Sequence, residues 1–198
     1  MIKKISQGAE AFITLNNNQV IKNRIKKSYR INEIDNKLIK SRTRSEAKII
    51  EKLNGIIPVP KIIKTNNEDE IIMEYLEGKK LSESLEKLDY LRIAKSLGNS
   101  IGKMHDKDII HGDLTTSNMI EKNNLVYLID FGLAYHSKKI EDKAVDLHLL
   151  KQALDAKHFT INKEFFNILL DSYSSKDKVE IIKRIKTIES RGRYKDKH

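Results

Sequence analysis

The spacing of apolar residues changes partway along the chain, from a strand-like period to a helical one. Short β-like runs are predicted over Ala11–Leu15 and Gln19–Ile25, separated by a triplet of asparagines that is typical of a turn. Apolar residues then recur at helical spacing between Ile31 and Leu53, until Gly55 and the only two prolines of the chain end the pattern. The first third therefore predicts a small sheet accompanied by one long helix.

A second pair of strands precedes a mostly helical region. Strands are expected over Lys61–Thr65 and Glu70–Tyr75, joined by a hairpin turn at the asparagine pair between them. Beyond Gly78 the helical period dominates. Helices are expected over Leu81–Leu88, Tyr90–His105, Asp142–Lys157, Lys163–Ser172 and Lys178–Ser190, with short β segments at Ile109–Ile110, Asn118–Ile120 and Leu125–Ile129. This order predicts an α+β fold with a β-rich N-terminal lobe over residues 1–76, a helical C-terminal lobe over 77–190 and a basic tail over 191–198.

Composition narrows the class of protein. A chain of 198 residues with 39% hydrophobic content can bury a sizeable core, as one domain or as one compact domain in two lobes. The absence of cysteine excludes disulfide scaffolds, Cys-ligated zinc and thiol catalysis. No apolar run approaches the roughly 18 residues of a membrane span, and the N-terminus lacks the apolar region of a signal peptide. We therefore expect a cytoplasmic protein with no membrane partner.

The excess positive charge is concentrated in two zones. The net charge is +10, and residues 22–48 hold ten basic and three acidic residues, while residues 176–198 hold nine basic and four acidic ones. Such zones are typical of proteins that bind nucleic-acid phosphates, although a solvated lysine-rich surface has the same composition. Aromatic residues make up only 6% of the chain, which argues against base stacking on single strands.

The candidate chemistry lies in the run His111-Gly112-Asp113-Leu114-Thr115-Thr116-Ser117-Asn118, which Asp130-Phe131-Gly132 follows at the end of an apolar strand. This spacing is similar to the catalytic loop and metal-binding motif of protein kinases. Phosphoryl transfer needs an Asp that meets the attacking hydroxyl or water, here Asp113, and metal ligands, here Asn118 and Asp130. His111 is expected to support the loop.

The small lobe is expected to hold the nucleotide. Lys22 ends the strand run Val20-Ile21-Lys22, as a phosphate-binding lysine does in kinases, and Glu46 on the long helix is its candidate partner. A lone glycine turn at residues 7–11 replaces the glycine-rich loop, and residues 73–76 fit a hinge whose backbone would bind adenine. The residues expected to bind ATP are Gly8, Ala9, Glu10, Ala11, Lys22, Met73, Glu74 and Leu76.

Missing features are informative as well. Gly112 stands where protein kinases carry the Arg that receives an activation-loop phosphate, so that form of switching is not expected. Only about a dozen residues separate Gly132 from the helix that bears Asp146, which leaves no room for a long peptide-docking segment. Asp146 resembles the helix Asp that supports the backbone of the catalytic loop.

Together these residues resemble the small atypical serine/threonine kinase and ATPase subunit of the KEOPS (EKC) complex, the p53-related protein kinase family, of archaeal type. The resemblance spans essentially the whole chain and implies a minimal two-lobed protein-kinase-like fold with a short activation segment. Tyr194 departs from it, since the family pattern usually continues there with a basic residue. The motifs that carry the resemblance are Gly8-Ala9-Glu10-Ala11, Ile21-Lys22-Asn23-Arg24 with Tyr29-Arg30, Arg42-Thr43-Arg44-Ser45-Glu46-Ala47, the loop His111–Asn118 and Arg191-Gly192-Arg193-Tyr194-Lys195.

The resemblance implies an activity and a set of partners. The activity is ATP-dependent phosphotransfer or ATP hydrolysis with Mg²⁺, beside the synthase subunit that makes N6-threonylcarbamoyladenosine at position 37 of tRNA. Contact with that subunit is implied through the helical lobe and the tail, where Arg191, Arg193 and Lys195 are candidates. A further regulatory subunit is implied at the small lobe, and tRNA is expected to bind through the assembled complex.

Three alternatives stay open from the sequence. A RIO-type kinase shares His-Gly-Asp, but is expected to lack a clean Asp-Phe-Gly and to carry Ser-x-Tyr-Asn in its loop. A small-molecule kinase of the aminoglycoside or choline type shares the same motif, yet needs a larger helical lobe for a substrate pocket. A non-catalytic pseudokinase that binds tRNA would not need the Lys, Glu, Asp, Asn and Asp that this chain keeps.

Overall fold

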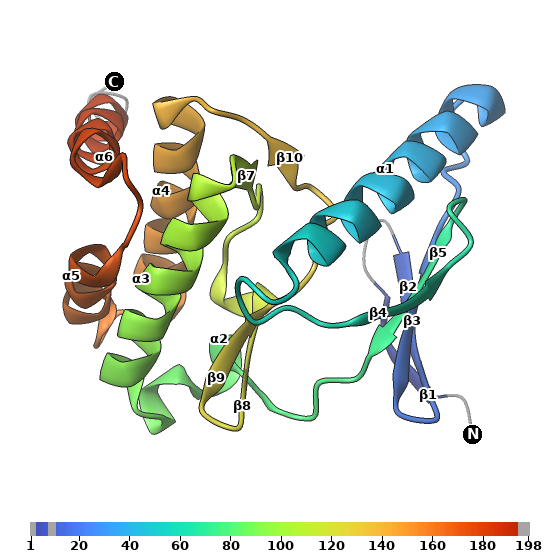
Figure 1. The fold of residues 1–198 in the computed structure, drawn as a ribbon, viewed down its shortest axis with the longest axis horizontal. Helices are drawn as coiled ribbons and strands as arrows, with labels where there is room; N and C mark the ends of the chain where they lie inside the picture. The colour runs from blue at the N-terminus through green and yellow to red at the C-terminus, as the bar shows by residue number, and fades with distance from the viewer. Residues whose placement is uncertain (1–2, 8–10, 194–198) are drawn as a thin grey trace.

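The N-terminal lobe of the computed structural model is an antiparallel sheet crossed by one long helix (Figure 1). The structure describes residues 3–7 and 11–193. The five strands lie in the order β1-β2-β3-β5-β4, so β3 is the central strand. The elements are β1 (Lys3–Gln7), β2 (Ala11–Asn16), β3 (Gln19–Arg24), α1 (Asn32–Leu53), β4 (Ile62–Thr65) and β5 (Glu70–Glu74).

The predicted asparagine turns are present. Asn17 and Asn18 both have positive φ, 46° and 61°, which is the backbone that a tight hairpin between β2 and β3 requires. Asn67 has a φ of 59° between β4 and β5. Asparagine tolerates this left-handed region better than most residues, so the turns follow from local chemistry.

Helix α1 buries only part of its apolar stripe. Ile49, Ile50 and Leu53 near its end are almost fully buried, whereas Ile31 and Ile34 at its start are exposed to 70% and 53%. The helical period predicted from the sequence is therefore correct, and the burial of its apolar residues increases from the exposed start of the helix through Ile39 to its C-terminal end.

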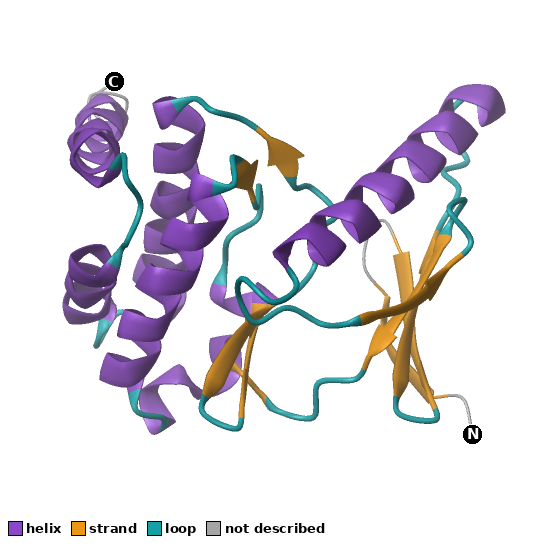
Figure 2. Cartoon of the chain, viewed as in Figure 1, coloured by secondary structure: helices purple, strands orange, loops and turns teal. Residues whose placement is uncertain are grey.

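The C-terminal lobe is mostly helical (Figure 2). Helix α3 packs against α5 and helix α4 against α6, and two small sheets, β6-β8-β9 and β10-β7, lie on the side that faces the first lobe (Figure 1). The elements are β6 (Lys79–Lys80), α2 (Leu81–Ser84), the 3-10 turn η1 (Leu85–Lys87), α3 (Tyr90–Asp106), β7 (Ile109–Ile110), the 3-10 turn η2 (Thr116–Asn118), β8 (Met119–Lys122), β9 (Leu125–Leu128), β10 (Tyr135–His136), α4 (Ile140–Lys157), α5 (Asn162–Ser172) and α6 (Lys178–Arg193). No described helix is both long and apolar enough for a membrane crossing.

Two predicted elements needed correction. The single helix expected over Leu81–Leu88 is a four-residue helix followed by a 3-10 turn. Asn118 was expected to begin a strand, but it closes the 3-10 turn η2 and the strand starts at Met119. In that turn the Asn118 side chain hydrogen-bonds to the carboxylate and the backbone carbonyl of Asp113. The lobe boundary after residue 76 stays a prediction.

Candidate functional site

Lys22 lies at the centre of a cluster of charged side chains between the two lobes. It projects from β3, where its residue pairs with Ile13 of β2 and Ile71 of β5. Its Nζ lies 2.6 Å from Glu46 Oε1 of α1 and 2.7 Å from Asp130 Oδ1, which follows β9. The structure thus brings together three residues that are far apart in the sequence.

Arg24 completes this cluster and was not assigned a role from the sequence. Its Nη2 donates to the second carboxylate oxygen of Glu46 at 2.5 Å, and both side chains are buried. Residues 22 and 24 alternate with Asn23 along a strand and so share one face of the sheet, which is the signal that could have identified Arg24. Two cations therefore face two carboxylates, as burial of charge requires.

The charges of the cluster stabilise one another. Burial alone would lower the pKa of Lys22, but Glu46 and Asp130 outweigh it and the pKa is raised. Burial alone would raise the pKa of Asp130, but the charge and hydrogen bond of Lys22 and the N–H of Gly132 hold the pKa below its usual value. Lys22 is therefore a cation and Asp130 an anion at neutral pH.

The backbone of the catalytic loop is fixed from helix α4. Asp146, fully buried, accepts the N–H of His111 at 2.8 Å and the N–H of Gly112 at 3.0 Å. Its carboxylate also accepts from Nε2 of His105 at 3.2 Å, while His105 Nδ1 accepts the hydroxyl of Tyr173 at 2.6 Å. Burial would raise the pKa of Asp146, but the hydrogen bond from His105, the electrostatic effect of His105 and His111 and the N–H of His111 hold the pKa below its usual value.

His111 connects the catalytic loop to the Asp-Phe-Gly segment. Its Nε2 donates to the carbonyl of Ile129 at 3.1 Å, and its Nδ1 lies 3.3 Å from the N–H of Asp113. Its ring also lies 4.7 Å from the ring of Phe131. His111 thus contacts both segments, and its supporting role stays a prediction.

Asp113 and Asn118 face each other across the loop. The Asn118 side-chain amide donates to the carboxylate of Asp113 at 2.8 Å and to its backbone carbonyl at 2.9 Å. The N–H of Ile129 donates to the backbone carbonyl of Asn118 at 3.0 Å, so Asn118 also lies next to the segment that bears Asp130. Asp113, Asn118 and Asp130, the three residues expected to act in phosphoryl transfer, therefore lie close together.

Two residues of the site have left-handed backbone conformations. Asp130 has a φ of 60°, which is uncommon for a residue with a side chain and often marks a functional position. Gly112 has a φ of 78°, and a Cβ there would lie 2.5 Å from the carbonyl oxygen of Leu133. The glycine in place of the kinase Arg thus has a local steric reason.

Several predicted contacts lie outside the described residues or are buried. Ala11, at the start of β2, and Met73 and Leu76 are buried, and Glu74 pairs with Gln19 at the end of β5. The ATP-binding roles of these residues stay predictions. The predicted residues that fall outside the described parts are Gly8, Ala9, Glu10 and Lys195, together with the side chains of Arg191 and Arg193.

Much of the first basic zone is engaged within the chain. Lys22 and Arg24 pair with Glu46, Arg30 pairs with Asp35 at 3.1 Å, and Lys40 and Arg44 both contact Glu68. These are five of the ten cations counted in this zone. The zone is thus not simply a free surface for an acidic partner.

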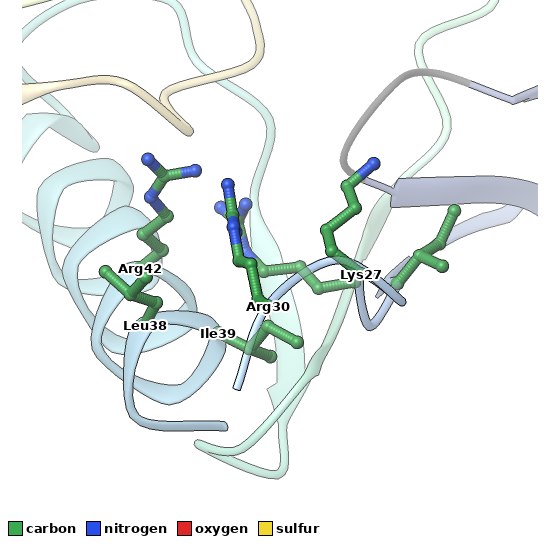
Figure 3. Close-up of a pocket in the computed structure, with 7 residues that line it drawn as sticks. Lys27, Arg30, Leu38, Ile39 and Arg42 are labelled. Atoms are coloured by element: carbon green, nitrogen blue, oxygen red, sulfur yellow. The ribbon is translucent and has the colours of Figure 1, made fainter. Parts of the chain in front are cut away.

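A small basic pocket lies beside the start of α1 (Figure 3). Arg42 extends from α1, and Lys27 and Arg30 extend from the segment before it, around Leu38 and Ile39. The pocket holds about 10 Å³, which is roughly the room of one water molecule and too little for a nucleotide.

The acidic and amide groups of the site suit a magnesium ion bound together with phosphates. No group of three or more His, Cys, Asp or Glu side chains placed for a metal occurs within the described parts of the chain. Mg²⁺ commonly takes only one or two carboxylates and completes its shell with water and substrate phosphates. The pair Asp130 and Asn118 fits that pattern, and the Asp130 side chain is half exposed.

Comparison with known proteins identifies the class first. A family model described as the RIO domain matches residues 1–151, and the chain belongs to this family of kinase-like domains. The motif differences noted above therefore do not exclude a RIO domain. A solved ternary complex of streptomycin, ATP and APH(2")-IIa matches with a TM-score of 0.64 over 93% of this chain and 81% of the other, at 16% identity, which supports the kinase-like fold alone.

Full-length relatives then identify the family within that class. The KEOPS complex subunit Bud32 of Pyrococcus abyssi is 43% identical over 99% of this chain and 98% of its own length. The EKC/KEOPS complex subunit BUD32 of Encephalitozoon cuniculi is 40% identical over 96% of this chain and 95% of its own length. The chain belongs to the Bud32 family.

Some relatives are longer proteins, and this chain is similar to only a part of them. A probable bifunctional tRNA threonylcarbamoyladenosine biosynthesis protein of Methanobrevibacter smithii is 44% identical over 96% of this chain, which spans 36% of that relative.

Proposed function

We propose that this chain is the ATP-using, kinase-like subunit of a KEOPS complex and supports threonylcarbamoyladenosine modification of tRNA. The names of its full-length relatives support the complex, and that of the bifunctional relative supports the modification. The observation that carries the ATP chemistry is the juxtaposition of Lys22, Glu46 and Asp130 with Asp113 and Asn118.

Lys22 is the group that would bind the α- and β-phosphates. Its raised pKa keeps it charged, and Glu46 orients it while Arg24 balances the second oxygen of Glu46. In the structure its ammonium is paired with the carboxylate of Asp130. The Asp130 carboxylate suits either of two positive groups. One is the Lys22 ammonium that it binds in the structure, and the other would be a metal ion bound to phosphate.

Asp130 and Asn118 would hold Mg²⁺, which when bound neutralises phosphate charge. Asn118 donates its amide N–H groups to Asp113, which leaves its amide oxygen as the ligand atom. The depressed pKa of Asp130 keeps its carboxylate ionised for this task.

Asp113 would orient the nucleophile and accept its proton. The nucleophile is a water in ATP hydrolysis or a serine hydroxyl in protein phosphorylation. The Asn118 amide and the braced loop hold the carboxylate in place, so positioning and charge neutralisation supply most of the rate.

The partners proposed for this chain follow the family. A synthase subunit would contact the helical lobe and the tail with Arg191, Arg193 and Lys195, and a regulatory subunit would contact the small lobe. Fusion of this sequence to a further segment in the Methanobrevibacter relative supports such an association, because one chain keeps both parts together. tRNA would be reached through the assembled complex in the cytoplasm.

The direct test is Asp113→Ala with magnesium and labelled ATP. The variant is expected to keep the wild-type melting temperature and to lose about a hundredfold to ten-thousandfold in γ-phosphate release or transfer. Wild-type turnover by the variant would refute the assigned role of Asp113, and no ATP binding by the wild-type chain would refute the proposed use of ATP.

A further inference from the structure

The middle of the catalytic loop is held by a buried histidine that the phosphotransfer mechanism does not use. His158 follows the last turn of α4, and its side chain is 1% exposed. Its Nδ1 lies 2.6 Å from Glu86 Oε1 in the turn η1, and its Nε2 lies 3.1 Å from the hydroxyl of Thr116. The three residues form one hydrogen-bonded chain from η1 to the catalytic loop.

The chemistry of Glu86 fixes the direction of these hydrogen bonds. A carboxylate only accepts, so Nδ1 of His158 carries the proton that it donates to Glu86. When the ring is neutral, Nε2 is the acceptor and the Thr116 hydroxyl donates to it; when the ring is protonated, Nε2 donates to the hydroxyl oxygen, and the same two groups stay joined. Partial burial would raise the pKa of Glu86, but the hydrogen bond from His158, its own backbone N–H and nearby positive charge lower it instead, which agrees with an ionised acceptor.

Thr116 occupies a position where its placement affects both functional side chains. It opens the 3-10 turn that ends at Asn118, and Asp113 lies just before that turn. It is 2% exposed, so its hydroxyl has little access to water. Any shift of this residue moves Asn118, whose amide holds the Asp113 carboxylate.

One helix therefore holds the loop at two points. Asp146, within α4, binds the backbone at His111 and Gly112, and His158, at the end of α4, binds the side chain of Thr116. The first contact fixes where the loop begins. The second fixes the turn that follows Asp113.

We infer that His158 is a positioning residue for phosphoryl transfer, which sets the turn between Asp113 and Asn118 through Thr116 while Glu86 fixes its tautomer. This inference rests on the proposed function. It also gives the second threonine of the Thr-Thr-Ser-Asn run a specific role, namely to present a hydroxyl to the buried imidazole.

The test uses matched substitutions on the full chain. Thr116→Val removes the hydroxyl at nearly constant shape, Thr116→Ser keeps the hydroxyl, and His158→Gln removes the imidazole. Thr160→Val is the control, because Thr160 is exposed close to His158. For Thr116→Val we expect kcat for magnesium-ATP turnover to fall about tenfold to a hundredfold with KM for ATP unchanged, as for a misplaced catalytic group.

A second measurement separates this inference from the proposed function. Backbone amide hydrogen exchange over residues 113–118 is expected to accelerate in Thr116→Val and His158→Gln, and to return to the wild-type rate in Thr116→Ser. If His158→Gln does not fold, the two Thr116 variants decide.

Defined outcomes would overturn the inference. They are wild-type kcat and wild-type loop exchange in Thr116→Val, a loss that Thr116→Ser does not restore, or an equal loss in Thr160→Val. If neither the wild-type chain alone nor the complete complex shows ATP turnover, the proposed function fails. The exchange of residues 113–118 then still decides whether His158 holds the loop.

Discussion

The two lobes differ in the forces that stabilise each of them. The N-terminal lobe has a small apolar cluster of Ala47, Ile71 and Met73, against which two further residues pack. The C-terminal lobe has one continuous core that reaches from the end of α1 to α6. The functional side chains follow this division, since charge pairs position those of the first lobe, while hydrogen bonds over an apolar core position those of the second.

This difference separates groups that can change partners from groups that stay fixed. Lys22 is bound to Asp130 by one ionic hydrogen bond between side chains, and a phosphate could replace that partner without disturbing the core. The loop bearing Asp113 is bonded through its own backbone to the buried Asp146, so moving it would break buried hydrogen bonds. Substrate binding is thus expected on the exchangeable side and proton transfer on the fixed side.

Helix α1 connects the charge cluster around Lys22 with the large apolar core of the second lobe. Ile49, Ile50 and Leu53 at its end belong to the large core, and Glu46 lies one turn before them. The carboxylate that orients Lys22 is therefore carried by a helix anchored in the other lobe.

Removal of the Lys22 ammonium should have the largest effect on ATP turnover. Lys22→Met keeps the length of the side chain, and we expect ATP turnover to fall about a hundredfold to a thousandfold, as when one preorganised charge donor is removed. Lys64→Met, on exposed β4, is the matched control and should keep wild-type turnover. Full activity in Lys22→Met would contradict the phosphate-binding role.

Removal of the shared carboxylate should chiefly affect stability. Glu46→Gln leaves Lys22 and Arg24 buried with too little negative charge, so the free energy of unfolding should fall by about 3–5 kcal/mol. Urea denaturation measures the change, and Glu51→Gln on the exposed side of the same helix is the control. An equal, small loss in both variants would show that the charge cluster does not stabilise the first lobe.

Two glycines with the same φ allow a test of how rigidly the loop that bears Asp113 is held. Gly112 and Gly55 both have a φ of 78°, but only at Gly112 would a Cβ meet a neighbour, the carbonyl of Leu133. Gly55→Ala should cost about 1–2 kcal/mol from its backbone angle, and Gly112→Ala about 2–4 kcal/mol from angle and clash together. Thermal unfolding compares them, and equal costs would mean that the loop can move away from Leu133.

Smaller effects are expected in the pH dependence of stability, first through Asp146, whose carboxylate binds the backbone of the loop. The pKa of Asp146 is lowered in the folded protein, so the stability it contributes is present above its unfolded pKa and is lost as the pH falls through the folded value. The unfolded value is about 3.9. Urea midpoints taken below pH 5 should therefore fall less steeply in Asp146→Asn than in the wild type. An unchanged slope would indicate that Asp146 does not need its charge to brace the loop.

Lys22 should act in the opposite pH range. Its pKa is raised in the folded protein, so the stability from its pairing is present below its unfolded pKa of about 10.4 and is lost as the pH rises through the folded value. A wild-type stability curve that falls at alkaline pH, and a flatter one for Lys22→Met, would agree with the charge cluster. Coincident curves would argue against it.

Residue types and spacing predicted the parts of the site that depend on local chemistry. The strand that bears Lys22, the loop from His111 to Asn118 and the strand before Asp130 all form near their expected places. The asparagine turns formed as well, because their backbone angles follow from the residue itself.

The contacts that could not be predicted join residues far apart in the chain. His158 reaches Glu86 and Thr116 across 72 and 42 positions, and no short motif records such a contact. The burial of α1 could not be predicted for the same reason, because the apolar Ile31 and Ile34 have the right period but remain largely exposed among the described residues. Periodicity indicates a face, whereas tertiary packing decides how much of it is buried.

The measurement that tests the central claim most directly is ATP turnover in the assembled complex. The chain would be combined with magnesium, the synthase subunit and tRNA, and phosphate release compared between the wild-type chain and Asp113→Ala. We predict that turnover rises when the synthase subunit and tRNA are present, and that Asp113→Ala abolishes the rise while still assembling. Equal turnover with wild-type and Asp113→Ala chains, or no ATP turnover in the complete complex, would contradict the proposal that this chain is its ATP-using subunit.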